Sequence, residues 1–149
     1  MSGQLDPIEL MKTINELEYK INALSTITKG WSPIPLTTPL TSTSYDGDDT
    51  VAVGVYTIDT SAVFGAPAGI KMAAIYFRAA WASASNTSLM NIRTTGTDAA
   101  TIIAGVRAQT TFSQDGFCNV PCDANGDFVL TVGGANALNV ILRIATYWI

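Results

Sequence analysis

The amino-acid sequence changes character at Gly30, and this break limits what the chain can fold into. All three glutamates and three of the four lysines precede Gly30. The 120 residues from Gly30 onward carry only 13 charged side chains, far below the usual proportion of about a quarter. A chain of 149 residues accommodates one domain with a core and a short appendage. We therefore predict an N-terminal oligomerisation and anchoring segment over residues 1–30, followed by a charge-poor head that hides part of its surface.

The first segment is predicted to form one helix over residues 7–28. Asp6 followed by Pro7 is typical of a helix start, because the carboxylate caps free amides and proline suits the first helical position. Gly30 is typical of a helix end. Apolar residues recur within this range at alternating spacings of four and three, which is the pattern of a coiled coil. These seam residues are Leu10, Ile14, Leu17, Ile21 and Leu24.

The seam predicts self-association, and it leaves the number of copies open. Alternating Ile and Leu favours two strands, whereas Met11 and Ile27 widen the apolar stripe, which suits three. A coil of about 22 residues is marginal by itself, so the head is expected to share in holding the copies together. The alternative is an amphipathic helix lying on the head.

Residues 31–50 are predicted to be an extended linker. Three prolines fall within residues 33–39, which excludes helix and favours an extended path. Threonine and serine then alternate over residues 41–44. A linker of this length favours a helix that pairs with other copies over one that folds back on the head.

Residues 51–149 are predicted to form an all-β head. Short runs rich in β-branched and aromatic residues alternate with clusters of Gly, Asn, Asp and Ser. The last run is the clearest, because its odd and even positions differ in character. One face is expected to lie in the core, and its residues are Leu138, Val140, Leu142, Ile144 and Thr146. The expected strands are 51–58, 70–82, 88–94, 101–112, 116–120, 127–132 and 138–148.

The connection at residues 123–127 predicts a tight hairpin between the strands on either side, because Asn125 and Gly126 suit a two-residue turn. With seven or eight such strands, the expected architecture is a jelly-roll-like β-sandwich. The predicted fold is thus an all-β sandwich head preceded by an N-terminal α-helix that forms a coiled-coil stalk.

The composition argues against an enzyme. Histidine, the commonest general base, is absent from the chain, and the head contains no glutamate. The aspartates at 46–49 and 123–127 could offer oxygen ligands to Ca²⁺, but neighbouring glycines favour ordinary turns, and no glutamate closes an EF-hand loop. We expect no catalytic residues, no metal and no cofactor.

Cysteines and aromatic residues are the remaining candidate functional groups. Cys118 and Cys122 have neither redox nor zinc-site spacing, so buried thiols are expected, with a disulfide between them left open. Trp31 and Trp81 are candidate ligand-facing aromatics that would suit a surface glycan. The alternative for these rings is packing in the core or between subunits.

Charge and hydropathy limit the partners. The net charge is −4 and the eight basic residues are scattered, so nucleic acid is not expected. Residues 1–6 lack a signal-peptide pattern, and no run approaches the roughly 20 apolar residues of a membrane helix. We expect synthesis in the cytoplasm without membrane insertion.

Three stretches of the head carry a family resemblance. They are residues 119–128 (NVPCDANGDF), 138–148 (LNVILRIATYW) and 75–81 (IYFRAAW). In these strand and turn patterns the chain resembles small virion proteins of tailed bacteriophages. The resemblance implies a homotrimer located in the virion, with other virion proteins as partners and with the N-terminal segment docked on the particle.

Three functions remain open from the sequence. The first is a short homotrimeric fibre whose head serves host recognition, with a host-surface glycan as a candidate partner. The second is a capsid decoration or cement protein that clamps capsomers. The third is a carbohydrate-binding module on a coiled-coil stalk.

Overall fold

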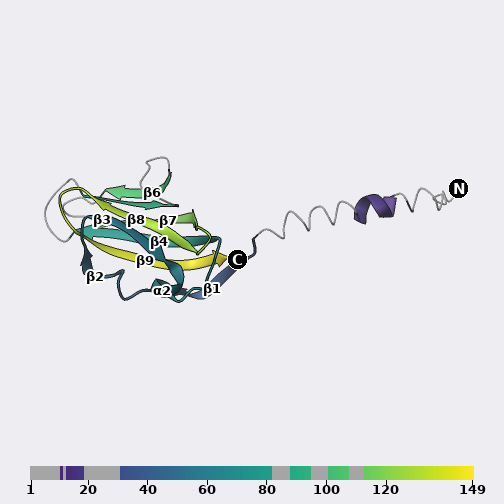
Figure 1. Cartoon of the computed structure of the whole chain (residues 1–149), viewed down its shortest axis with the longest axis horizontal. Coiled ribbons are helices and arrows are strands. Elements are labelled where there is room, and N and C mark those ends of the chain that lie inside the picture. The colour runs from purple at the N-terminus through teal and green to yellow at the C-terminus, as the bar shows by residue number, and fades with distance from the viewer. Residues whose placement is uncertain (1–10, 12, 19–30, 82–87, 95–100, 108–112) are drawn as a thin grey trace. The chain divides into compact units, whose positions relative to one another are not determined.

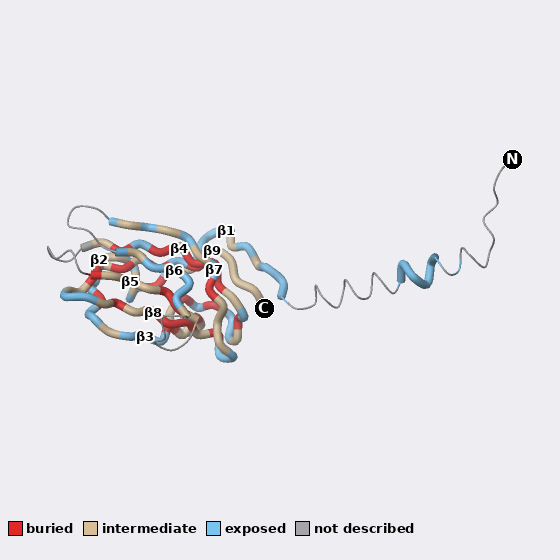
Figure 2. Tube along the Cα trace, turned by 90° about the horizontal axis from the view of Figure 1, so that it is seen from above, coloured by how far each residue is buried: buried red, intermediate tan, exposed pale blue. Residues whose placement is uncertain are grey.

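The computed structural model describes residues 11, 13–18, 31–81, 88–94, 101–107 and 113–149, and the chain divides into two compact units, Met1–Ser32 and Pro33–Ile149. In the first unit, residues 13–18 are α-helical, and each of their side chains is exposed (Figure 2). Met11 is also helical and exposed, and the rest of the predicted helix, including Leu10, Ile21 and Leu24, lies outside the described residues.

The second unit is all-β, as predicted. Its described residues form nine strands in two antiparallel sheets, with one short helix, α2 (Thr60–Phe64). Each predicted strand overlaps an observed one. The strands are β1 (Pro33–Leu40), β2 (Asp46–Val51), β3 (Gly54–Asp59), β4 (Met72–Trp81), β5 (Leu89–Arg93), β6 (Ile102–Arg107), β7 (Gln114–Pro121), β8 (Asp127–Gly133) and β9 (Leu138–Trp148).

The two sheets draw on strands from along the whole head (Figure 1). The five-stranded sheet has the order β1-β9-β4-β7, and β2 also pairs with β9. The four-stranded sheet has the order β3-β8-β5-β6. Six of the eight connections between consecutive strands pass from one sheet to the other. Residues that contact one another in the head are therefore mostly distant in the sequence.

The core lies between the two sheets. Ile75 and Leu142 of the five-stranded sheet, and Phe128 and Leu130 of the four-stranded sheet, are fully buried in one apolar cluster. Figure 2 shows the buried positions recurring along the strands of the head. Alternation along each strand places these side chains inward and leaves their sequence neighbours on the outer faces.

The last strand has the predicted bounds, and four of its five predicted core residues are fully buried: Leu138, Val140, Leu142 and Ile144. The fifth prediction, Thr146, is wrong, because a β-bulge precedes it. Ile75 of β4 pairs with Ile144, whereas Ala74 pairs with Thr146, so Ala145 is an extra residue. After this bulge it is Tyr147 that pairs with a core residue and packs against the core.

The segment predicted as a linker contributes two strands. Ile34 of β1 pairs with Tyr147, and Asp46 of β2 pairs with Ile141, so both strands lie along β9. The prolines are compatible with β1 because it is an edge strand, where amide donors facing away from the sheet are not needed. The compact β unit therefore begins at Pro33 and not at Val51.

Two connections differ from the prediction because the strands that they join belong to different sheets. The turn at 123–127 forms, with the amide of Asp123 donating to the carbonyl of Asp127 over 2.9 Å. However, β7 pairs with β4 while β8 pairs with β3 and β5, so the predicted hairpin is wrong. The predicted strand 51–58 is likewise divided, because β2 ends at Val51 in one sheet and β3 begins at Gly54 in the other.

Candidate binding site

A pocket of about 230 Å³ lies on the outer face of the five-stranded sheet, where β2, β4 and β9 meet. Strand register explains its position, since Arg78 pairs with Ile141 and Ala80 pairs with Asn139 across two neighbouring strands. Their alternate neighbours, including Ala79 and Val140, face the core. The pocket is lined by Asp46, Gly47, Asp48, Arg78, Ala80, Asn139 and Ile141.

The wall of the pocket formed by β2 is a tight turn that depends on Gly47. The amide of Asp48 donates to Oδ1 of Asp46 over 3.0 Å, which fixes the turn and the first carboxylate. Gly47 has a φ of 96°, in the region that favours glycine. A Cβ at this position would also lie 2.8 Å from Cγ1 of Ile141. Gly47 thus lets the turn approach the sheet while both carboxylates stay exposed at the rim.

The opposite side of the pocket carries a cation and an amide. Arg78 is exposed, and its Nη2 donates to Oγ of Ser113 over 2.8 Å, which restrains the long side chain. Asn139 is half-buried, and its Oδ1 accepts no hydrogen bond from the part of the chain that the structure describes. The lining therefore combines groups that only accept, a group that only donates, and an amide that does both.

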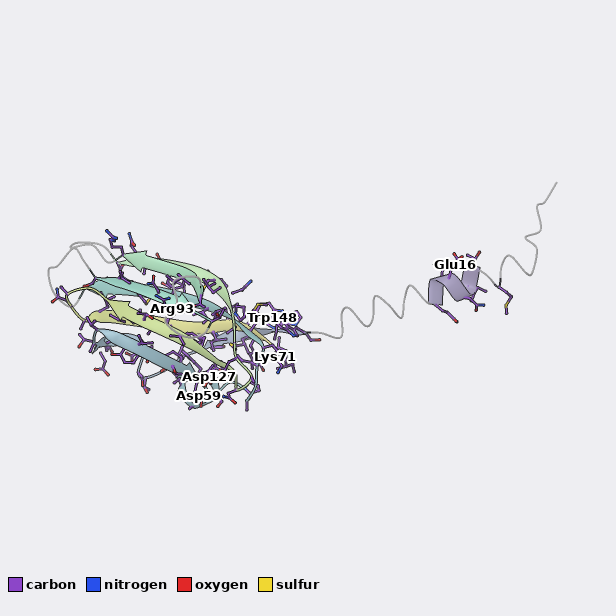
Figure 3. The ribbon with its side chains drawn as sticks, turned by 45° about the horizontal axis from the view of Figure 1, so that its top comes forward. Glu16, Asp59, Lys71, Arg93, Asp127 and Trp148 are labelled. Atoms are coloured by element: carbon purple, nitrogen blue, oxygen red, sulfur yellow. The ribbon has the colours of Figure 1, made fainter. Side chains whose placement is uncertain are left out.

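A second polar cluster gathers Asp59, Asp123 and Asp127 at one end of the head. Asp59 and Asp127 are paired across β3 and β8, and Figure 3 shows them next to one another. Oδ1 of Asp123 accepts the amides of Asn125 and Asp127 over 2.8 and 2.9 Å. These bonds serve the turn itself, in line with the prediction of an ordinary turn at 123–127.

The pKa values of Asp59 and Asp127 are shifted in opposite directions. Bonds donated by the amide of Ala62 and by the side chain and amide of Ser61 lower the pKa of Asp59, which caps α2. Burial raises the pKa of Asp127, and the charges of Asp123 and Asp59 add to this rise. Within the described residues, no group of three His, Cys, Asp or Glu side chains is placed to hold a metal ion.

Both cysteines are half-buried thiols without a disulfide. Burial raises the pKa of Cys118 to about 11. The pKa of Cys122 is raised to about 12, by burial and then by the charges of Asp123 and Asp127. Both thiols are therefore protonated near neutral pH, and neither is an activated nucleophile.

The residues selected from the sequence do not converge on the pocket. Ile14 and Leu17 of the seam are 42% and 52% exposed, and Trp31 is 49% exposed. Trp81 ends β4 opposite Leu138, and its side chain lies outside the described part of the structure. Sequence analysis missed Arg78, Asn139 and Ile141 as site residues; the aspartates at 46–48 were noticed only as a turn and a weak Ca²⁺ candidate.

Among the described residues, no helix has the length and apolar character needed to cross a bilayer. The chain matches no protein-family model, no curated protein and no solved structure.

Proposed function

We propose that this protein is a structural component of a virion, a short homotrimeric fibre of a tailed bacteriophage without enzymatic activity. Residues 1–30 dock on the particle and pair with the same segment of the other copies. The β head faces outward and presents its surface to the host. Its partners are therefore its own copies and other virion proteins.

The exposure of Ile14 and Leu17 is the observation that carries the proposal. Both lie on the helix over residues 13–18, three positions apart and therefore on one side of it. They are 42% and 52% exposed in the single chain, which leaves an apolar stripe without cover. Association of copies along such a stripe buries apolar surface, which is the driving force for a coiled coil. Leu10, Ile21 and Leu24 continue the same spacing in the sequence.

The strand order of the head supports a jelly roll as its fold. The orders β1-β9-β4-β7 and β3-β8-β5-β6, with most connections passing between the sheets, suit a chain wound twice around a common core. Jelly rolls recur in viral capsid proteins and in lectins. The small number of charges from Gly30 onward supports the burial of head surface between copies, since charged residues are depleted at the centre of interfaces.

Deleting residues 1–29 tests how much the N-terminal segment and the head each contribute to the association of copies. The head is expected to remain associated in sedimentation, because a coil of about 22 residues is marginal without help. The full-length chain in the same buffer is the reference, and it should associate more tightly. A truncated head that sediments as a monomer at every concentration would contradict the proposed role of the head.

A capsid decoration or cement protein is the second candidate, and the low charge of the head favours it, because a clamp between capsomers buries extensive surface. The two functions differ in copy number. Quantitative mass spectrometry of purified particles should find few copies for a fibre. A number close to that of the capsomers or threefold positions would favour the cement protein instead.

A further inference from the structure

We propose that the pocket between β2, β4 and β9 is a saccharide site that binds one neutral pyranose ring. The proposed site rests on the proposed function, because it gives the outward-facing head a ligand on the host surface. Its test does not depend on assembly, because the pocket is lined by residues of a single chain.

The size of the pocket limits the ligand. Its volume of about 230 Å³ is below the range of about 300–1,000 Å³ that is usual for drug-sized molecules. A single sugar ring, or the terminal ring of a longer glycan whose remainder stays in solvent, fits this limit. The exposed positions of Asp46, Asp48 and Arg78 at the rim leave a path for such a remainder.

The chemistry of the lining favours neighbouring hydroxyl groups. The carboxylates of Asp46 and Asp48 can only accept hydrogen bonds, whereas the guanidinium of Arg78 can only donate them. A hydroxyl both donates and accepts, so a ring with several hydroxyls can satisfy both kinds of group at once. Ile141 supplies an apolar contact for the C–H groups of the ring, as sites for small molecules usually do beside their polar groups.

The charges of the lining disfavour ionic ligands. Two carboxylates beside one guanidinium give the pocket a formal excess of negative charge, which repels anions. Arg78 in the same lining opposes a bare cation held by Asp46 and Asp48. A neutral polyhydroxyl compound avoids both penalties while it still forms charge-assisted hydrogen bonds, which are the stronger kind.

The polar groups are held in place before a ligand arrives. Asp46 is fixed by the amide of Asp48, Arg78 by the hydroxyl of Ser113, and the turn by the close approach of Gly47 to Ile141. Binding therefore orders few side chains, which reduces its entropic cost. The cluster of Asp59, Asp123 and Asp127 differs, because the hydrogen bonds that Asp59 and Asp123 accept serve α2 and the turn at 123–127.

The test is a titration of the full-length protein with methyl glycosides of glucose, galactose, mannose and N-acetylglucosamine. Saturation-transfer NMR measures the binding of each glycoside. At least one glycoside should bind saturably. Arg78→Gln and, separately, Asp48→Asn should each weaken its binding about tenfold or more, because each removes a charge-assisted hydrogen bond. The matched controls are Arg143→Gln on β9, the strand that pairs with β4, and Asp49→Asn, the neighbour of Asp48 in β2; both residues are exposed and neither lines the pocket.

The pocket is established as the site if the Arg78→Gln and Asp48→Asn variants bind more weakly, both controls keep the affinity of the parent, and all four variants keep its melting temperature. Three results would overturn the proposed site. They are no binding of any glycoside, Arg78→Gln and Asp48→Asn variants that bind as tightly as the parent, and losses of affinity that are as large in the controls as in these variants. If Arg78→Gln alone lowers the melting temperature, the result for Asp48→Asn decides, because Asp48 is an exposed residue of β2. Native mass spectra of the same samples separate a failure of this site from a failure of assembly.

Discussion

Apolar side chains are exposed on the helix over residues 13–18, whereas the β head buries an apolar core. Ile14 and Leu17 are 42% and 52% exposed, whereas Phe128 and Leu142 in the head are fully buried. The head contains its own apolar core. Over residues 13–18 the apolar side chains of the helix are exposed, and covering them with another surface would gain free energy. Under the proposed function, the buried residues of the head stabilise the fold and the exposed residues of the helix serve assembly.

The largest effect is expected from Phe128→Ala. Phe128 is fully buried between the sheets, and truncating such a ring costs about 3–5 kcal/mol of unfolding free energy. Urea-induced unfolding of the variant and the parent measures the loss. The matched control is Phe117→Ala, whose ring is 59% exposed. A cost for Phe128→Ala no greater than that of the control would show that the core is not where we place it.

A smaller loss is expected from Asp59→Ala. The carboxylate of Asp59 accepts bonds from the amide and hydroxyl of Ser61 and from the amide of Ala62, at 2.7–3.0 Å, and so caps α2. The effect is measured as a lower melting temperature near neutral pH, with Asp49→Ala, a change to an exposed residue of β2, as the control.

The same variant also predicts a pH dependence. Because the folded-state pKa of Asp59 is lowered, its stabilising contribution is present above the pKa of the unfolded chain and disappears as pH falls through the folded-state value. The melting temperatures of parent and variant should therefore converge in acid. A gap that stays constant down to the lowest accessible pH would contradict the role of the ionised carboxylate.

Asp127→Asn should shift stability by less and with the opposite pH dependence. Burial, with the charges of Asp123 and Asp59, raises the folded-state pKa of Asp127. Its protonated form is favoured in the fold, so this contribution is present below the unfolded pKa and is lost as pH rises through the folded pKa. The variant should therefore gain more stability relative to the parent near pH 7 than in acid. Thermal melts across that range measure the gain, and an equal difference throughout would count against it.

The smallest effect on the head is expected from the double change Ile14→Asn and Leu17→Asn. Both side chains are exposed in the single chain, so the melting temperature of the head should stay within error of the parent. Association measured by sedimentation should weaken. The control is Thr13→Ser with Glu16→Gln, which leaves the apolar stripe intact. Unchanged association of the Asn variant would remove the helix from the interface.

Local pattern was enough to predict the all-β head and the bounds of β9, because alternation over 138–148 is a property of neighbouring residues. The bulge at Ala145 was not predictable in this way, since it depends on how β9 registers with β4. The strands β1 and β2 were missed for a related reason. Their prolines and aspartates are typical of a linker, and these segments form strands because they pair with β9, which lies far away in the sequence.

The pocket could not be predicted from any local sequence pattern. Asp46, Arg78 and Asn139 belong to three strands that are far apart in the sequence, and only the pairing of β2 and β4 with β9 brings them together. Each residue alone is an ordinary surface residue of a strand or turn. The one local signal was the aspartate pair around Gly47, whose turn the structure retains.

The mass of the full-length protein in solution shows whether copies of the chain assemble, as the proposed function requires. Native mass spectrometry at low salt, combined with sedimentation at several concentrations, gives the number of copies of the 15.7 kDa chain. We expect a trimer that persists on dilution, and we expect the Ile14→Asn and Leu17→Asn variant to dissociate first. A monomer at all concentrations would contradict assembly, and a stable dimer would contradict the trimer.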